Sequence, residues 1–407
     1  MTSQRTHSLG DSSSDSVAAA TGGWWETTLG EAGVELQHGY TFPSGDLSPD
    51  GGLPVVRIGN VQRGQIVIDD AVRYSGNVSS ESLSKQLVSY GDLLIALTGG
   101  DESNLNTSTG RIGRYNIKTP ALLNQRVAKV LPSGQTDPDF LFYLLLQPSI
   151  TRYLAATANG SVQRNLTNGH ILGLEVSLPS LAEQCSIAAV LSSLDDKIDL
   201  LRRQNETLEQ IAQLIFKEWF VKPTADGVLP EGWKLGTLGE IAEIDWGNTN
   251  LTKSSYSPTG QYLGVSAAGG DGRIAHAEHP VGTSVISAIG EYAGRMFYPH
   301  EPFTAIKNTL TVSPIEGVST PGYIHNLLAQ HTLPRRGAAQ PFLSKGDTEE
   351  YEVVVPPLSE ILRAESLFSV LDEKVRENLV SIQTLVRTRD SLLPQLMSGE
   401  VRVGISG

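Results

Sequence analysis

The sequence predicts an α+β protein in which two globules alternate with two long helices that pack on each other. Three observations support this fold class. One heptad repeat occupies residues 191–219, a second occupies residues 368–396, and short strand-like runs fill the segment before each repeat. A chain of 407 residues exceeds one simple domain, so two to four domains are expected.

The first long helix is predicted over residues 191–219, because its core-type positions alternate gaps of three and four residues. These positions are Leu191, Leu194, Ile198, Leu201, Asn205, Leu208, Ala212, Ile215 and Trp219. Such spacing keeps one seam facing a partner helix along a left-handed coiled coil. At 1.5 Å per residue the helix would span roughly 40 Å. So narrow an apolar seam requires a partner.

The chain supplies that partner near its C-terminal end. The same pattern returns at Phe368, Leu371, Val375, Asn378, Ile382, Leu385, Arg389, Leu392 and Leu396. We expect the two helices to pair through Leu194, Ile198, Leu201, Asn205, Leu208, Leu371, Val375, Asn378, Ile382 and Leu385.

Composition narrows the class of protein. No uninterrupted apolar run reaches the ~20 residues needed to span a bilayer, and no secretory signal pattern opens the chain. The single cysteine, Cys185, excludes an intrachain disulfide and a cysteine-cluster metal site. A cytoplasmic location is therefore expected. The net charge of -13 and pI near 5.1 argue against a whole-surface electrostatic grip on nucleic acid, although local basic faces remain compatible with DNA reading.

In chain order, we expect a disordered tail at residues 1–22, because this segment is rich in Ser, Ala, Asp and Thr. The first globule spans 23–178, with β-rich runs separated by Gly, Pro and Asn turns and one helix capped by Asp137. A helical region at 179–222 and a linker at 223–230 follow. The second globule spans 231–355, and a second helical region spans 356–403.

An internal repeat relates the two halves. Gly23–Glu31 matches Gly232–Glu240, Gly160–Leu166 matches Gly337–Leu343, Leu178–Gln184 matches Val355–Ile361, and Ser193–Ile198 matches Val370–Val375. The last three pairs share one offset, whereas the first pair has another. The repeat therefore predicts similar helices and globules that differ in length and content.

The ordered set of repeated motifs resembles the specificity subunit of Type I restriction–modification enzymes. The resemblance covers residues 23–403 and is carried by the GW…TLGE start of each globule and the Q-x-x-L turn near each globule's end. The LP-x-L-x-E helix starts, the LDDKI and LDEKV heptads and the closing LLPQLMSGEVRV segment at Leu392–Val403 complete it.

This resemblance implies that each globule is a target recognition domain, an α/β domain that reads one half of a split, asymmetric DNA site. The two helices pair antiparallel and act as a spacer, whose predicted length is comparable to one turn of B-DNA, ~34–36 Å. Two methyltransferase subunits and restriction/translocase subunits are the implied partners, with double-stranded DNA and no membrane. The chain itself would carry no active site or cofactor. S-adenosylmethionine, ATP and Mg are expected on the partners, which methylate adenine and cleave DNA.

The residues supply no catalytic signature of their own. No G-x-x-x-x-G-K-[ST] phosphate loop is present. His276 and His279 lie in a Gly/Pro-rich segment without an evident third ligand, so we interpret them as surface or DNA-facing histidines and expect no metal site. Gly269–Gly272 is interpreted as a turn.

The DNA-contact candidates are basic and amide residues predicted in loops. Amides suit adenine edges and guanidinium groups suit guanine, and we also expect Tyr115 to pack on a sugar or base. The alternative is that these basic and amide residues are solvated surface residues that do not contact DNA. In the first globule the candidates are Arg57, Asn60, Arg63, Arg111, Arg114, Lys118, Asn124, Gln125, Arg126, Gln163 and Arg164; in the second they are Arg273, Arg295, Lys307, Asn308, Arg335, Arg336 and Gln340. Because the Q-x-x-L turn recurs in both globules, we assign it to the phosphate backbone or to the turn itself.

Two asparagines interrupt the apolar heptads. In an antiparallel pair, a layers face d layers, so a pseudo-dyad between the Leu201 and Asn205 levels would place Asn205 opposite Asn378. Alternatively, each asparagine faces water at the edge of the seam. Two other functions also stay open: a specificity-like subunit of another phage-defence methyltransferase system, and a coiled-coil adaptor whose globules bind protein.

Overall fold

The computed structural model describes residues 23–76, 81–99, 108–160, 164–337 and 340–403. The predicted tail at residues 1–22 lies outside these ranges. The chain forms two compact units. Unit 1 contains Met1–Asp196 and Val386–Gly407, and unit 2 contains Lys197–Leu385. Each long helix contributes one end to each unit.

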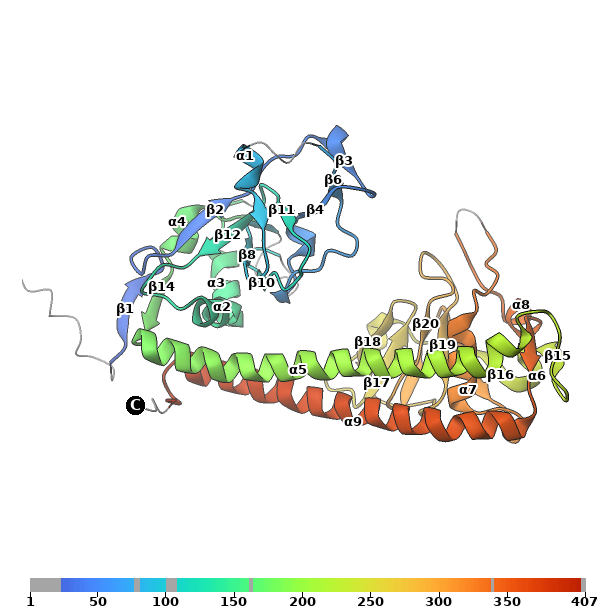
Figure 1. The fold of residues 1–407 in the computed structure, drawn as a ribbon. Coiled ribbons are helices and arrows are strands. Elements are labelled where there is room, and N and C mark those ends of the chain that lie inside the picture. The colour runs from blue at the N-terminus through green and yellow to red at the C-terminus, as the bar shows by residue number, and fades with distance from the viewer. Residues whose placement is uncertain (1–22, 77–80, 100–107, 161–163, 338–339, 404–407) are drawn as a thin grey trace, which may run out of the picture. The chain divides into compact units, whose positions relative to one another are not determined.

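Unit 1 is built mainly from short strands (Figure 1). They are β1 (Trp25–Thr28), β2 (Glu35–His38), β3 (Leu47–Ser48), β4 (Leu53–Val56), β5 (Gly64–Gln65), β6 (Arg73–Tyr74), β7 (Leu87–Val88), β8 (Leu93–Ala96), β9 (Thr98–Gly99), β10 (Ile112–Arg114), β11 (Ala121–Leu123), β12 (Val127–Leu131), β13 (Arg164–Asn165) and β14 (Glu175–Leu178). Two five-stranded sheets have the orders β2-β12-β8-β10-β5 and β3-β6-β4-β11-β7, and β1-β14 and β13-β9 form two-stranded sheets.

The short helices described in unit 1 are α1 (Glu81–Ser84), α2 (Pro138–Leu146), α3 (Pro148–Thr157) and α4 (Asn168–Leu172). Three of them, α2 to α4, pack in the core of the first of these sheets, whereas α1 packs beside the second through Leu83. As predicted, Asp137 caps α2, since its carboxylate accepts a 2.8 Å hydrogen bond from the Phe140 amide. The expectation of a single helix in this globule is wrong. Pro148, at the first position of a new helix, starts α3 directly after α2.

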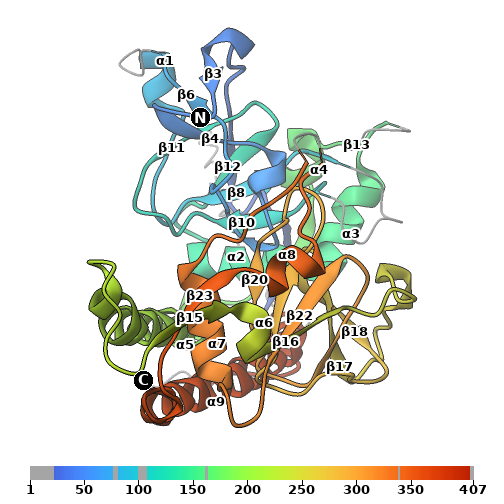
Figure 2. The same cartoon turned by 90° about the vertical axis from the view of Figure 1, so that its right-hand side faces the viewer.

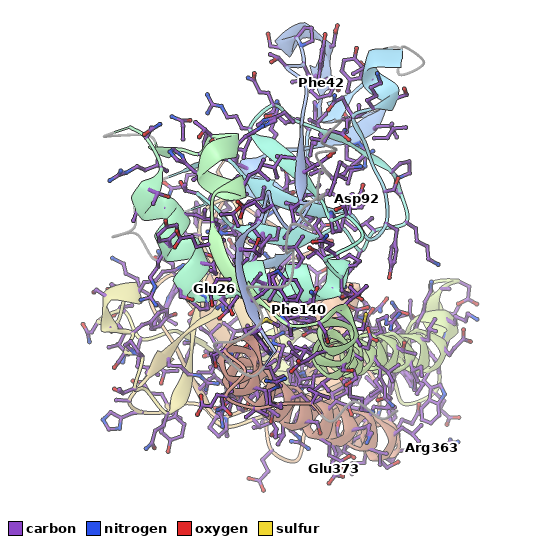
Figure 3. The ribbon with its side chains drawn as sticks, turned by 90° about the vertical axis from the view of Figure 1, so that its left-hand side faces the viewer. Glu26, Phe42, Asp92, Phe140, Arg363 and Glu373 are labelled. Atoms are coloured by element: carbon purple, nitrogen blue, oxygen red, sulfur yellow. The ribbon has the colours of Figure 1, made fainter. Side chains whose placement is uncertain are left out.

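Helix α2 forms the centre of the unit 1 core. Its residues 140–146 are all buried, against the sheet on one side and the ends of the long helices on the other. Phe140 is labelled in this core in Figure 3, and Phe42 belongs to a separate small cluster at the outer part of the globule. The apolar run that follows Asp137 is therefore explained by burial on both faces of the helix.

Unit 2 repeats this plan with a different set of elements. They are β15 (Lys234–Thr237), α6 (Leu238–Ile241), β16 (Ala242–Trp246), β17 (Tyr262–Ser266), β18 (Gly269–Ile274), β19 (Ser284–Ser287), β20 (Met296–Phe297), β21 (Phe303–Ala305), β22 (Thr309–Pro314), α7 (Pro321–Gln330), α8 (Lys345–Glu349) and β23 (Glu352–Val355). Their sheets have the orders β16-β22-β19-β20, β18-β17-β21 and β15-β23. Helix α7 lies between the four-stranded sheet and the long helices, as Figure 2 shows.

The two globules share a common set of strand pairs although their sequences differ. The order β2-β12-β8-β10 in unit 1 corresponds to β16-β22-β19-β20 in unit 2, and β1-β14 corresponds to β15-β23. A parallel strand pair accompanies each sheet, β4 with β11 and β17 with β21. The units therefore keep these strand pairs, and their predicted divergence includes strands as well as loops, since β5 extends the first sheet of unit 1 and β18 pairs with β17 in unit 2.

The predicted turn at Gly269–Gly272 is wrong, because these residues begin strand β18. Glycine is required there by packing. A Cβ atom at Gly272 would lie 2.0 Å from the Tyr256 ring, and one at the facing Gly264 would lie 2.3 Å from the same ring. The Tyr256 ring thus packs on Gly264 and Gly272 of this strand pair. Its hydroxyl donates a 3.0 Å hydrogen bond to Asp271.

The long helices are α5 (Leu181–Phe216) and α9 (Leu358–Met397). A π-helical turn at Lys217–Val221 and a 3-10 turn at Lys222–Thr224 follow α5. Within each unit the start of one helix lies beside the end of the other, so the two run antiparallel (Figure 1). In the part of the chain that the structure describes, no helix is both long and apolar enough to cross a membrane.

Candidate nucleic-acid interface

In unit 1 the chain turns sharply just before β12, and this turn carries two of the predicted candidates. Gln125 and Arg126 are both exposed there. The Leu97 amide donates to the Arg126 carbonyl at 2.9 Å, and the Gln125 amide donates to the Tyr40 carbonyl at 3.0 Å. We call Tyr40, Gln125 and Arg126 the first corner. Asn124 lies beside it, half-buried, with its side-chain oxygen 3.3 Å from the Arg126 amide.

Close backbone packing holds the first corner in place. The Tyr40 amide donates to the Leu123 carbonyl at 2.8 Å. The preceding residue, Gly39, admits no side chain, since a Cβ atom would lie 2.2 Å from the Asn124 carbonyl oxygen. The backbone of this corner is therefore fixed by glycine and by hydrogen bonds, and its outward side chains are free to differ without altering it.

Unit 2 has a second corner of the same backbone design, formed by Asn248, Lys307 and Asn308. The Ala288 amide donates to the Asn308 carbonyl at 2.9 Å, and the Asn248 amide donates to the Ala305 carbonyl at 2.7 Å. Gly247 takes the place of Gly39, because a Cβ atom there would lie 2.2 Å from the Thr309 hydroxyl. Asn308 has a φ of 72°, a left-handed conformation that asparagine tolerates better than most residues.

An arginine-lined groove adjoins the second corner. Arg295 and Arg335 line an open cavity of about 320 Å³ together with Tyr292 and Leu333. The Arg295 guanidinium lies 5.8 Å from the Tyr292 ring centroid and 5.3 Å from that of Phe297. Ser287 and Ala288 connect groove and corner, since the Ser287 amide donates to the Arg295 carbonyl at 2.8 Å and the Ala288 amide donates to the Asn308 carbonyl at 2.9 Å.

Two more candidates of the second globule lie on the segment that follows Arg335. Arg336 is ion-paired with Asp347, and its backbone exchanges two hydrogen bonds with Phe342. Gln340 is exposed between them. Arg273 lies elsewhere: it belongs to β18 in the other sheet, where it forms a 2.7 Å ion pair with Glu301. The structure thus brings Arg295 and Arg335 into one groove and Lys307 and Asn308 into one corner, whereas Arg336 lies in a separate pocket with Asp347 and Arg273 lies in the other sheet.

In the first globule some candidates serve the fold. Arg114 forms a 2.7 Å ion pair with Asp139 and stacks 4.3 Å over Phe142, with only 17% of its side chain exposed. The expectation of a surface Tyr115 is wrong. This side chain is fully buried, because it alternates inward from β10, and its hydroxyl donates a 2.6 Å hydrogen bond to the Thr119 carbonyl. Asn60 closes its own turn by binding the Arg57 amide and the Val67 carbonyl.

The remaining candidates of the first globule are spread over several loops. Arg57 is half-buried, whereas Arg63 and Lys118 are exposed. Arg111 is half-buried and donates at 3.3 Å to the Val61 carbonyl and the Gln62 side chain, and burial lowers its pKa. Arg164 donates at 2.9 Å to the Ala158 carbonyl. Gln163 lies outside the described residues.

Sequence reasoning missed four surface residues near these corners and the groove. Tyr40, Tyr292 and Phe342 are exposed aromatic side chains, and Asn248 is an amide whose nitrogen donates to Glu278 at 2.7 Å. A usable signal was the glycine that precedes both Tyr40 and Asn248 at the same point of each repeat. Aromatic rings beside cationic groups are common where proteins hold nucleic-acid bases.

The helix pair contains the expected asparagine contact. The Asn378 amide nitrogen donates to the Asn205 side-chain oxygen at 2.7 Å, and both residues are buried, with 2% and 7% exposure. Ile198, Leu201 and Val375 are buried in the same seam. The other predicted pairing positions are half-buried; they are Leu194, Leu208, Leu371, Ile382 and Leu385.

The two histidines predicted to bind no metal lie within the residues described. Groups of three or more His, Cys, Asp or Glu side chains placed to hold a metal ion are absent from these ranges. His279 is half-buried against the Phe303 ring, and burial lowers its pKa, while His276 is exposed. What the two globules present is a pair of like-shaped polar corners with unlike side chains.

Comparison with known proteins agrees with this duplicated plan. The family described as "Type I restriction modification DNA specificity domain" matches residues 22–210 and 230–376. The MjaIX specificity subunit of Methanocaldococcus jannaschii is 28% identical over 342 residues, which cover 74% of this chain and 77% of that protein. The HindI specificity subunit of Haemophilus influenzae is 29% identical over 140 residues, 34% of this chain and 29% of that protein.

A solved structure has the same fold. The Type I restriction–modification S subunit from M. genitalium matches with a TM-score of 0.54 and 18% identity, covering 93% of this chain and 97% of that one.

Proposed function

The chain belongs to the Type I restriction modification DNA specificity family, and from this premise we propose that it recognises a bipartite, asymmetric DNA site and directs adenine methylation and restriction by partner subunits. One observation carries the bipartite part of the proposal. Two globules with a common set of strand pairs present corners that equivalent backbone hydrogen bonds hold, with different polar side chains. A protein that reads two unlike half-sites needs this combination of a constant scaffold and variable side chains.

The proposed role is recognition without catalysis. The two corners and the arginine groove offer donors, acceptors and aromatic rings suited to bases and phosphates. We assign the chemistry to partners: two methyltransferase subunits that bring S-adenosylmethionine, and restriction/translocase subunits that use ATP and Mg. Because its substrate would be genomic DNA, we place the protein in the cytoplasm.

We propose the following division of labour along the chain. Residues 23–178 and 231–355 form the two target recognition domains. Residues 179–222 and 356–403 form the helical regions, and residues 223–230 link the first helix to the second domain. The exposed candidates at the corners and groove contact DNA. The buried Asn205–Asn378 contact fixes the register in which the two long helices pair.

The negative net charge of the chain indicates that its partner subunits contribute to DNA binding. With a net charge of -13, the chain has little long-range attraction for phosphate beyond its local basic groups. We expect the isolated chain to bind DNA weakly at physiological salt, and the complex with its methyltransferase partner to bind tightly and selectively.

A gel-shift experiment tests this function. The chain alone, and the chain copurified with its methyltransferase partner, are incubated with labelled host DNA fragments and excess competitor. Selective retention of a subset of fragments by the complex is expected. A complex that discriminates among no fragments would contradict the proposal and favour a protein-binding adaptor. Tight, selective binding by the isolated chain would refute only the expectation that the partner is needed for tight DNA binding.

A further inference from the structure

Backbone hydrogen bonds relate positions of the two corners to each other. In unit 1 the Leu97 amide bonds the Arg126 carbonyl, and the Leu97 carbonyl accepts from Leu166. In unit 2 the Ala288 amide bonds the Asn308 carbonyl, and the Ala288 carbonyl accepts from Leu343. These four hydrogen bonds measure 2.8–2.9 Å. Arg126 therefore occupies the same backbone position as Asn308, and Gln125 the same position as Lys307.

The neighbouring strands extend the correspondence. The Ala96 amide donates to the Arg111 carbonyl at 2.9 Å, and the Ser287 amide donates to the Arg295 carbonyl at 2.8 Å. Arg111 immediately precedes β10 and Arg295 immediately precedes β20, so the two arginines occupy equivalent positions in the two globules. Here the two globules carry the same residue, arginine.

A contrast follows from these equivalences. Positions that shape the backbone are the same in both globules, as with Gly39 and Gly247, which a side chain would prevent from packing. One cationic position is also the same, at Arg111 and Arg295. The outward corner positions differ in both pairs. A group common to two domains that read different sequences suits the phosphate backbone, which is the same in every sequence, whereas the differing groups suit base edges.

Side-chain chemistry indicates which bases these are. Arginine donates two parallel hydrogen bonds to the N7 and O6 atoms of guanine, and asparagine pairs with N7 and N6 of adenine. The Thr41 hydroxyl donates a 2.5 Å hydrogen bond to the Gln125 side-chain oxygen, whereas Arg126 is exposed at the same corner. In the second corner Asn308 has a left-handed backbone, with a φ of 72°.

We propose that Arg126 and Asn308 are equivalent specificity-determining residues, Arg126 reading a guanine in one half of the site and Asn308 an adenine in the other half. Arg111 and Arg295 contact backbone phosphate in both halves. This inference rests on the proposed function and deepens it by assigning one reading position to each half of the site.

The test is a selection from randomised DNA duplexes by the complex of the full chain with its methyltransferase partner. Wild-type complex is expected to enrich a motif with two specific segments. Arg126→Gln should reduce the guanine preference at one base pair of one segment by roughly 10- to 100-fold and leave the other segment unchanged. Asn308→Gly should do the same to an adenine of the other segment.

The variants are chosen so that the fold is kept. Arg126 engages Leu97 through its backbone carbonyl, which glutamine retains. Glycine at 308 accepts the left-handed backbone and removes the amide alone. The matched control, Arg295→Ala, should weaken binding to all sequences several-fold and lower the salt dependence, without changing any base preference.

Each outcome decides. A changed preference in one segment for Arg126→Gln and in the other for Asn308→Gly supports the assignment. Unchanged motifs for both variants, changes in the same segment, or an altered base preference for Arg295→Ala would overturn it. If the wild-type complex enriches no motif, the proposed function itself fails and this inference falls with it.

Discussion

Each unit has an aspartate on a long helix at the same position of the sequence repeat, and the side chains that bind this aspartate differ between the units. The sequence repeat aligns Asp195 with Asp372. In unit 1 Asp195 accepts from the Arg389 guanidinium at 2.6 Å and from the Tyr143 hydroxyl at 2.7 Å. In unit 2 Asp372 lies 2.8 Å from the His300 ring nitrogen and 3.4 Å from Arg376.

Each unit also has a pair of stacked side chains, and these pairs too differ between the units. Arg114 stacks over Phe142 in unit 1, and Tyr298 stacks on His325 in unit 2 with ring centroids 4.1 Å apart. Phe142 and His325 each follow the first proline of α2 or α7 by four residues. We call the aspartate and these neighbouring side chains of each unit its joint. The two joints occupy equivalent places and differ in chemistry, and among the residues described the histidines His300 and His325 belong to the second joint.

Loss of the arginine in the first joint should have the largest effect on this comparison. Arg389→Ala leaves the Asp195 carboxylate, 28% exposed, without its cation. We expect unit 1 to lose about 2–3 kcal/mol of unfolding free energy. Arg376→Ala, the matched control in unit 2, removes a half-exposed cation and should cost less than about 1 kcal/mol. Hydrogen exchange of α2 and α7 amides measures each joint separately. Equal losses in both joints would break the contrast.

Acid should weaken the second joint selectively. Burial lowers the pKa of His325 to about 4 from its ordinary 6.5. The folded state therefore binds fewer protons than the unfolded state, and stability falls as pH drops from about 6.5 to about 4, by up to about 3 kcal/mol. Burial raises the pKa of Glu209 and Glu365 in the same unit, and their protonation offsets part of the loss.

His325→Phe installs the residue that unit 1 has at this position and sharpens the test. Protection of α7 amides should fall between pH 7 and 5 in the wild type and much less in the variant, whereas α2 protection should change little in both. An α7 protection that ignores pH in the wild type, or that falls equally in His325→Phe, would show that the histidine is not responsible.

The buried asparagine pair should have a smaller effect. Asn378→Leu leaves the Asn205 amide unpaired in the seam, which should cost about 1–2 kcal/mol of unfolding free energy. Replacing both asparagines by leucine should restore that stability, because no polar group then remains unpaired. The repeat places leucine at 201 and isoleucine at 382 in the equivalent positions, so an apolar layer is compatible with the pair of helices. A double variant as unstable as the single one in a double-mutant cycle would contradict this account.

Much of this organisation follows from the sequence, and the exceptions have a common cause. The heptads predict both helices and even the Asn205–Asn378 contact, because seam positions depend on local spacing alone. Gln125, Arg126, Lys307 and Asn308 also stand out, since exposed polar residues cluster at turns.

Contacts between distant segments decide the residues that sequence reasoning misplaces. Arg114 is drawn inward by Asp139 and Phe142, and Tyr115 is buried in a cluster that contains Val56 and Val61. Tyr40 and Asn248 reach the corners only because they bond Leu123 and Ala305, far along the chain. Periodicity carries no signal for such pairings. Equivalence between the corners likewise required the hydrogen bonds of both globules, because the loops differ in length.

Mapping of methylated adenines across a genome that expresses this chain with its partner subunits tests the central claim most directly. We predict that methylation depends on the chain and marks a motif of two short specified segments separated by an unspecified spacer of fixed length. A continuous motif, or a methylation pattern that persists when the chain is deleted, would contradict the account of two globules reading two halves of one site.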